Sequence, residues 1–205
     1  MNILLIILLS IFFLITVERV KRQKNFTPQN TRRFAHIGAT VIAACSAFIV
    51  PKNIIVISCI GFALAMLYSH KKKLLSSVHD VNRKTYGEIF LPLGEAITAL
   101  LFLPHSIPAF QFGVLVLGFS DASASFIGEK YGHHPFTLFN NKKSIEGSAA
   151  FFIVTLLITL FFLPTVGLHL LFIPLLLTLV EAMLSFGLDN LIIPVFGSLL
   201  FSYFM

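Results

Sequence analysis

Acidic and basic residues gather in one polar stretch of a chain that is otherwise 57% hydrophobic. Asp121 lies among small residues and is followed, after one loop, by Lys142 and Lys143, with Ser144 and Glu146 directly behind them. A carboxylate close to a membrane is costly unless it is paired or binds a metal, and lysines bind phosphate as mobile point charges. This combination predicts a site for a divalent metal and a polyphosphate.

The residues around Asp121 are small or polar. In a regular helix Gly118, Asp121, Ser125 and Gly128 share one face, and small side chains there would let phosphate oxygens approach a metal held by Asp121. The alternative interpretation is a carboxylate that pairs with a neighbouring helix and serves packing alone.

The segment Lys142–Ser148 comes directly before a long apolar run. Ser144 is suited to cap the helix that this run predicts, and the amino end of a helix favours anions. An ordinary basic flank of a membrane helix would explain Lys142 and Lys143, but it would not explain the Glu146-Gly147 pair that follows.

A second basic segment opens the apolar run that begins near residue 35. Arg32 and His36 are four residues apart and share a helix face. Arginine can clamp a phosphate with two hydrogen bonds, and histidine can donate to phosphate or orient a carboxylate. A positive membrane flank beside a structural histidine explains the same residues equally well.

Further polar residues stand at or inside later apolar runs. Arg83 precedes one run as a basic flank or a phosphate ligand, and Glu95 lies deep in that run without an assignable role. Glu181 lies inside an apolar run, which makes it a functional candidate. Asp189, next to Asn190, is a site residue or only a helix cap.

The composition indicates one class of protein. Only 12% of the residues are charged, which is too few for the surface of a soluble domain of 205 residues. Cys45 and Cys59 lie in apolar runs and do not form a disulfide framework. The net charge of +6 is no sign of nucleic-acid binding, because the basic residues stand beside apolar segments. The sequence predicts a single polytopic membrane domain.

Eight apolar segments predict an all-α membrane bundle of seven or eight transmembrane helices. They cover residues 2–17, 35–51, 53–69, 88–104, 107–127, 147–163, 166–185 and 190–204. The first lacks the basic start and cleavage site of a signal peptide, so we expect a retained first span. The segment 88–104 contains Pro92 and two glutamates, and a kinked or re-entrant path is its alternative.

The basic residues support this layout. With eight spans the loops 18–34, 70–87 and 128–146 fall on one side, and of the 15 Lys and Arg only Lys52 lies elsewhere. Because basic loops stay cytoplasmic, we expect a multi-pass protein of the cell membrane with both termini outside. The polar residues described above, except Glu95, then lie near the cytoplasmic face.

Taken in order, these blocks resemble the family of CTP-dependent lipid-alcohol kinases, which includes dolichol kinase and phytol kinase. The resemblance extends from about residue 30 to the end and rests on the segments 32–38, 83–88, 118–132, 142–148 and 181–194. The short chain is most similar to the phytol-kinase branch. The resemblance implies that residues 1–205 form one integral-membrane kinase domain that uses CTP and Mg²⁺ to phosphorylate a long-chain isoprenoid alcohol at the cytoplasmic face. Phytol, farnesol, geranylgeraniol and the polyprenol or dolichol class are the candidate substrates.

Three other functions stay open from the sequence. The family also includes CTP-dependent diacylglycerol kinases. Phosphatidate cytidylyltransferase is a distant relative, but its Pro-Gly-His-Gly-Gly type of signature does not occur in this chain. A transporter of an anionic lipid or small anion would carry polar groups through the depth of several helices, whereas here they crowd one side.

The resemblance also implies roles for individual residues. We expect Asp121 to bind the metal, with Glu146 or Glu181 as second ligand, and Asp189, Glu181 or His36 to accept the proton of the alcohol. The candidates for binding the nucleotide phosphates are Arg32, Arg33, Arg83, Gly128, Lys142, Lys143, Ser144, Gly147 and Asn190.

Overall fold

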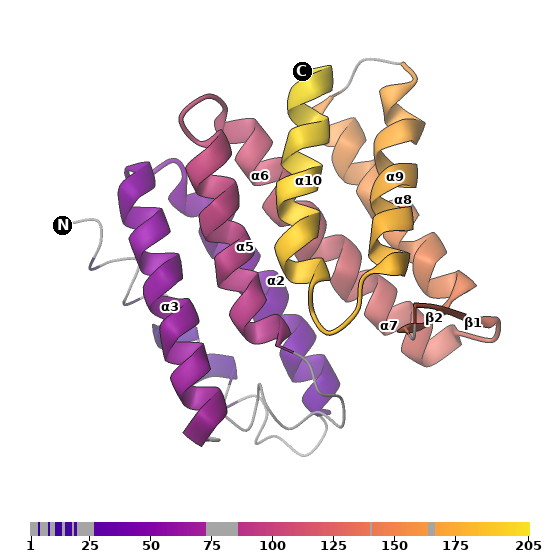
Figure 1. Ribbon diagram of the computed structural model, residues 1–205, viewed down its shortest axis with the longest axis horizontal. Coiled ribbons are helices and arrows are strands. Elements are labelled where there is room, and N and C mark those ends of the chain that lie inside the picture. The colour runs from indigo at the N-terminus through magenta and orange to yellow at the C-terminus, as the bar shows by residue number, and fades with distance from the viewer. Residues whose placement is uncertain are drawn as a thin grey trace.

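The computed structural model describes residues 27–72, 86–139, 141–163 and 167–205, together with scattered positions between 4 and 19. These residues form a bundle of helices with one small hairpin (Figure 1). The elements are α2 (Pro28–Ser46), α3 (Lys52–Lys72), α5 (Gly87–Phe102), α6 (Ile107–Leu115), η1 (Val116–Asp121), α7 (Ala122–Tyr131), β1 (Pro135–Leu138), β2 (Asn141–Ser144), α8 (Ile145–Phe162), α9 (His169–Met183) and α10 (Asp189–Phe204). The all-α prediction is confirmed, and the hairpin of β1 and β2 is an addition to it.

Seven of the eight predicted apolar segments correspond to these helices. Half of the first, 2–17, lies outside the described residues, and Arg83 lies outside them altogether. The second begins earlier than predicted, at Pro28 instead of residue 35, and ends at Ser46. Thr27 caps this helix by accepting a hydrogen bond from the Asn30 amide at 3.2 Å, and a proline suits the first helical turn. Hydropathy alone missed these two polar turns, which contain Arg32.

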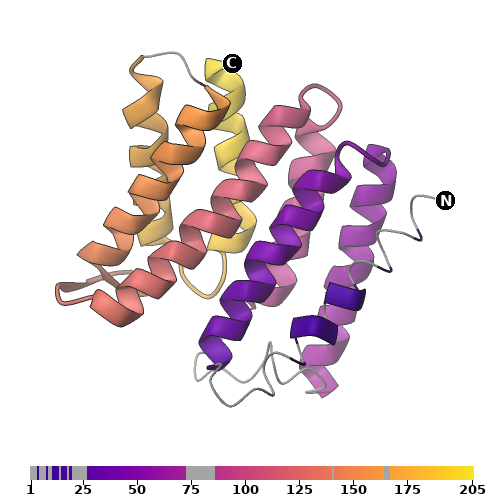
Figure 2. The same cartoon turned by 180° about the vertical axis from the view of Figure 1, so that it is seen from behind.

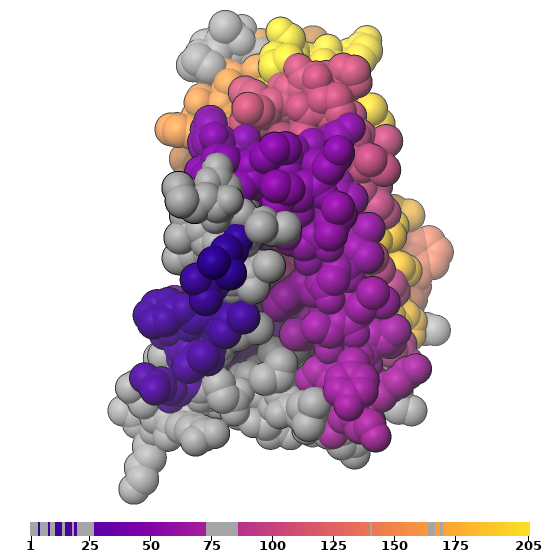
Figure 3. All heavy atoms as spheres, turned by 90° about the vertical axis from the view of Figure 1, so that its left-hand side faces the viewer, coloured from indigo at the N-terminus to yellow at the C-terminus, as the bar shows by residue number. Residues whose placement is uncertain are grey.

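Three helical stretches are long and apolar enough to cross a membrane, namely Lys52–Lys72, Ile107–Tyr131 and Ile145–Phe162. α9 and α10 are apolar but shorter, so the predicted number of spans stays a prediction. Large hydrophobic side chains are exposed along α3, among them Ile57, Leu64 and Tyr68. Figure 3 shows the face of the molecule over which α3 runs lengthwise. An exposed apolar surface of this extent is typical of contact with lipid.

The stretch Ile107–Tyr131 is the central element of the bundle. It comprises α6, η1 and α7, and it is more deeply buried than the other two long stretches. α2 and α10 pack on α6, while α8 packs on η1 and α7. Gly113 allows α10 to approach α6 closely, because a Cβ atom there would lie 2.2 Å from the carbonyl oxygen of Pro194 in α10. Small residues at such crossings are typical of helix packing in membranes.

The helix ends next to the polar segments lie at one end of the bundle. In Figures 1 and 2 the start of α2, the end of α3, the start of α5, the end of α7, the hairpin and the turn between α9 and α10 all lie at the lower end. The α2–α3 and α5–α6 turns and the C-terminus lie at the upper end. This alternation agrees with the loop arrangement that the basic residues predicted, for the helices that the structure describes.

Candidate active site

Asp121 is the last residue of η1, a six-residue π-helical turn inside the central stretch. π-Helical turns inside α-helices occur frequently at functional sites. The turn also changes which neighbours the surrounding residues meet. A Cβ on Gly118 would collide with Thr40 of α2, whereas a Cβ on Gly128 would approach Ser144 before α8. Gly118 and Gly128 therefore do not line one common surface around Asp121. The prediction from a regular helix had assumed that they would.

The hairpin delivers one of the two lysines to the interior. β1 and β2 pair antiparallel, with Phe136 opposite Lys143 and Thr137 opposite Lys142. Successive side chains of a strand point to opposite faces, so the two lysines separate. Lys142 is exposed, while the Lys143 side chain is only 19% exposed.

Lys143 forms an ion pair with the buried Glu181 of α9. Burial alone would lower the pKa of Lys143, but the carboxylates of Glu181, Asp121 and Asp189 raise it by more, so this pKa lies above its ordinary value. Lys143 therefore stays positively charged at physiological pH, as a phosphate ligand must.

Four more charged or titratable groups, from α2, η1 and α10, interact electrostatically with Lys143 or with one another. Asp121 lies within electrostatic range of both Lys143 and Arg32. Asp189, at the start of α10, lies within range of Asp121, Lys143 and His36. We call this group, Arg32, His36, Asp121, Lys143, Glu181 and Asp189, the polar cluster. It unites six residues that the sequence predicted as site residues.

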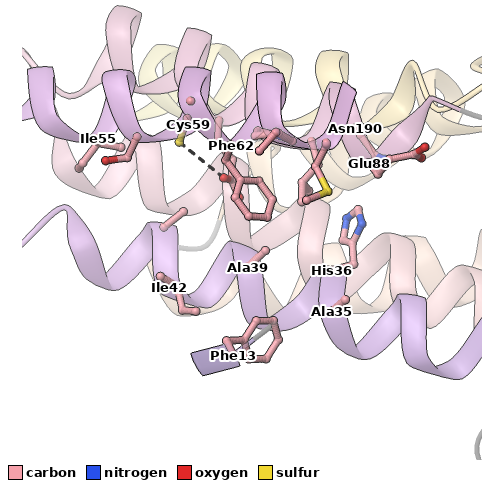
Figure 4. A pocket seen from close by; sticks show the side chains of 18 of the residues that line it. Phe13, Ala35, His36, Ala39, Ile42, Ile55, Cys59, Phe62, Glu88 and Asn190 are labelled. Atoms are coloured by element: carbon pink, nitrogen blue, oxygen red, sulfur yellow. Dashed lines mark hydrogen bonds between the residues drawn. The ribbon is translucent and has the colours of Figure 1, made fainter. Parts of the chain in front are cut away.

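A cavity of about 520 Å³ adjoins the polar cluster between α2, α3 and α5. Arg32 and His36 belong to the cluster and also line this cavity, together with Asn190 at the start of α10. The remaining lining is mostly apolar and extends along α2 as far as Ser46, which is about 20 Å of helix. Figure 4 shows His36 pointing from α2 into this space, across from Asn190 and Glu88.

The Nε2 atom of His36 is buried and has no hydrogen-bond partner within the part of the chain that the structure describes. A buried polar atom without a partner is unfavourable by about 1–3 kcal/mol. Because His36 lines the cavity, a polar group of a bound molecule could supply the missing partner. The polar end of the cavity therefore lies at His36.

Glu146 lies apart from the polar cluster. Its carboxylate accepts hydrogen bonds from the His134 backbone amide at 3.2 Å and is 2.6 Å from Nδ1 of the same residue. The Ile145 amide also donates to the His134 carbonyl oxygen at 3.0 Å. Glu146 thus closes the base of the hairpin that carries Lys143, and its predicted role as a metal ligand stays a prediction.

Arg33 connects α2 to α7. Its guanidinium group donates to the Ser125 hydroxyl and to the Ser125 carbonyl oxygen, both at 3.0 Å, and it forms an ion pair with Glu129. It also donates to the Asn30 side chain at 2.7 Å. These contacts give Arg33 a structural role, because they join α2 to α7. Arg32, one residue earlier, lines the cavity instead.

Ser144, Gly128 and Gly147 meet where α7 and α8 come closest. Ser144 caps α8, as predicted, and accepts a hydrogen bond from the Gly147 amide at 3.1 Å. A Cβ on Gly147 would lie 2.9 Å from the Ala124 carbonyl oxygen, and one on Gly128 would lie 3.0 Å from the Ser144 hydroxyl. Both glycines therefore permit close helix packing, and their contact with phosphate stays a prediction.

Two asparagines hold the ends of helices around the cluster. Asn190, a predicted phosphate ligand, donates from its side chain to the Gly87 carbonyl oxygen at 2.9 Å and so joins α10 to α5. Asn141 donates to the Leu184 carbonyl oxygen at 2.5 Å and joins the hairpin to the end of α9. The sequence analysis did not single out Asn141, although asparagine near a turn is a recognisable signal.

The polar cluster suits a magnesium ion that arrives with phosphate. Within the described residues, no three His, Cys, Asp or Glu side chains converge closely enough to hold a metal by themselves. Mg²⁺ is usually bound by one or two carboxylates, with phosphate oxygens and water as the other ligands. Asp121 and Asp189 offer two such carboxylates, and Lys143 and Arg32 offer positive charge for the phosphates. The donor set therefore fits a metal–polyphosphate rather than a metal alone.

The fold is an apolar helical bundle of the kind found in membranes, and its polar cluster lies at one end beside a mostly apolar cavity. No family model matches the chain, and no solved structure matches it. The chain is similar to a curated protein named phytol kinase from Synechocystis sp., with 26% identity over 195 residues, which cover 91% of this chain and 84% of that protein. The match confirms the resemblance to a phytol kinase that the motifs predicted.

Proposed function

We propose that this protein transfers the γ-phosphoryl group of CTP to the hydroxyl group of a long-chain isoprenoid alcohol, with Mg²⁺ as the metal. The observation that carries the proposal is the junction at Arg32 and His36, which belong both to the polar cluster and to the lining of the cavity. Phosphoryl transfer requires positioning and charge neutralisation more than covalent chemistry. At this junction the cluster would neutralise the phosphates of the soluble donor, and the cavity would position the lipid acceptor.

The comparison supports the lipid side of the proposal. The Synechocystis protein is named for phytol, an alcohol with a long hydrocarbon tail, and this chain aligns over most of its length. The cavity between α2, α3 and α5 is mostly apolar and about 20 Å long. An apolar tail would fill it, and the hydroxyl group would then lie at the polar end beside His36.

The residues of the polar cluster have different roles in binding the phosphates and the metal. Lys143 and Arg32 bind and neutralise the phosphates. Glu181 holds Lys143 in place through their buried ion pair. Asp121 and Asp189 would hold the metal, which would supply positive charge to neutralise the charge that develops during transfer.

His36 is the proposed acceptor of the alcohol proton. The oxygen of the alcohol forms a bond to the γ-phosphorus of CTP, the bond between that phosphorus and the β–γ bridging oxygen breaks, and CDP leaves with the electron pair. The proton of the hydroxyl passes to Nε2 of His36, the buried atom that lacks a partner in the described chain. Asp189 is the alternative acceptor, because it lies within electrostatic range of His36. Glu181 is less suited, since Lys143 occupies one of its oxygens.

The orientation in the membrane is part of the proposal. CTP is cytoplasmic, and the positive-inside rule places the basic helix ends on that side. The lower end of the bundle in Figure 1, with the polar cluster, then faces the cytoplasm, and the C-terminus lies outside.

Isotope labelling tests which group moves. Purified protein in lipid vesicles receives phytol or farnesol, Mg²⁺, and CTP labelled on either the γ- or the α-phosphorus. We expect label in the lipid fraction from γ-labelled CTP, with release of CDP, and none from α-labelled CTP.

The opposite result identifies a different enzyme. Lipid label from the α-phosphorus, with pyrophosphate released, would show a cytidylyltransferase. Transfer of γ-label to diacylglycerol but not to the isoprenoid alcohols would show a diacylglycerol kinase. Either outcome would contradict the proposal.

A further inference from the structure

A further polar side chain lines the cavity away from its polar end at His36. Glu95 of α5 is 5% exposed and lines the cavity. It lies seven residues after Glu88, which lines the polar end, and seven residues correspond to about 10 Å along a helix. Figure 4 shows Cys59, whose thiol contacts the Glu95 carboxyl group, well away from the end that Glu88, Asn190 and His36 mark.

The Glu95 carboxyl group is only partly satisfied. The Cys59 thiol is 3.8 Å from Oε2, which is a weak contact of a weak donor. The other oxygen, Oε1, is buried and has no hydrogen-bond partner in the chain as far as the structure describes it. A carboxyl group in this state is unfavourable in an apolar wall unless something in the cavity binds it.

A serine that lines the same cavity also has a buried polar atom without a hydrogen-bond partner. The Ser58 hydroxyl of α3, next to Cys59, is buried and lacks a hydrogen-bond partner in the described ranges. Ser58 also lines the cavity. Two unsatisfied polar groups from two helices thus line one mostly apolar space, and a chance packing defect is a poor explanation for both.

A contrast within the cavity sharpens this point. Ser46 lines the same space, but its hydroxyl donates to the Ala43 carbonyl oxygen at 2.7 Å. Helical serines commonly satisfy themselves in this way. Ser58 does not, so its hydroxyl is available to a molecule in the cavity.

We propose that Glu95 and Ser58 form a hydrogen-bonding subsite for a hydroxyl group carried partway along the tail of the bound lipid. A hydroxyl group is both donor and acceptor, so it can donate to Glu95 Oε1 and accept from Ser58. The preferred ligand is then a long-chain alcohol with a second hydroxyl about 10 Å from the polar end of the cavity. The inference rests on the proposed function for the identity of the cavity as a lipid site, but not on the transfer of phosphate.

Binding without nucleotide tests the subsite independently of catalysis. Purified protein in detergent is equilibrated with a radiolabelled straight-chain alcohol. The competitors are the same unlabelled alcohol and a diol of equal length with its second hydroxyl at that depth. A wholly apolar cavity would bind the diol more weakly, because a buried hydroxyl without a partner is costly. We expect the reverse, with the diol bound at least about tenfold more tightly.

Variants locate the effect. The Glu95→Leu, Ser58→Ala double variant should bind the diol no more tightly than the simple alcohol, while Ser46→Ala, the matched control, should keep the preference of the unaltered protein. Equal or weaker binding of the diol by the unaltered protein, as when water satisfies both groups, would overturn the proposal. That comparison stands even if the double variant does not fold. A preference that survives in a folded double variant would also overturn it. Failure of phosphoryl transfer with intact diol preference would contradict the proposed function alone.

Discussion

Replacing Asp121 with asparagine is expected to abolish phosphoryl transfer while the protein stays folded. Asparagine has nearly the same shape, but it removes the negative charge that lies within range of Lys143 and Arg32. A metal that bridges phosphates contributes several kcal/mol of charge stabilisation in the transition state. Loss of its main ligand should therefore lower kcat by about a thousandfold or more. The measurement is the rate of γ-phosphoryl transfer at saturating CTP.

The matched control for this variant lies on the same helical stretch. Glu129 is a half-exposed carboxylate eight residues later, paired with Arg33 and outside the polar cluster. Glu129→Gln removes one negative charge from the same helical stretch, and this variant should keep most of the activity. Circular dichroism melting in detergent verifies the fold of both variants. An Asp121→Asn variant with near-normal turnover would remove Asp121 from the proposed metal site.

The second large effect is expected from the two adjacent lysines, which should behave very differently. Lys143→Met should lower kcat/KM for CTP by at least about a hundredfold, because it removes the buried cation of the polar cluster. Lys142→Met should change kcat/KM little, because its side chain is exposed on the other face of the hairpin strand. Steady-state kinetics with varied CTP concentration measures both.

Lys143→Met also breaks the ion pair with Glu181, so a loss of activity could come from a loss of stability. A second substitution at Glu181 separates the two effects. Removing one partner of a buried pair typically costs about 3–5 kcal/mol of stability, whereas replacing both by apolar residues is often neutral. The Lys143→Met, Glu181→Leu double variant should therefore melt near the unaltered protein but stay inactive. Activity restored together with stability would show that the pair serves folding alone.

Much of the helical layout followed from hydropathy and charge. The apolar runs located α3 and α5–α10 within a few residues, because each must bury or expose a continuous apolar surface. The start of α2 was missed for the same reason, since its first turns are polar and depend on the Thr27 cap. The hairpin was missed because its two strands have only four residues each, too few for a periodic pattern.

The chemistry of the site was predictable by residue type but not by partner. Asp121, Lys143 and Glu181 were expected site residues, and the fold brings them together. That Lys143 and not Lys142 turns inward depends on strand pairing. That Glu146 turns to His134 depends on the closure of the hairpin. A single sequence carries little information about such contacts between elements.

The residues that line the cavity were not predicted from the sequence. Most of its lining comes from α2, α3 and α5 and includes small residues such as Ala39 and Gly61, which look like ordinary packing residues in the sequence. Glu95 was recognised as unusual without a role. Its place in the cavity wall became clear only from the packing of α5 on α3.

Manganese binding tests the central claim, that the polar cluster holds the metal–nucleotide complex. Mn²⁺ replaces Mg²⁺ in many phosphate sites and its electron paramagnetic resonance signal changes on binding. With CTP present, we expect protein-bound Mn²⁺ for the unaltered protein and for Glu146→Gln, and little for Asp121→Asn. Binding that survives in Asp121→Asn but is lost in Glu146→Gln would place the metal at the base of the hairpin and contradict the account.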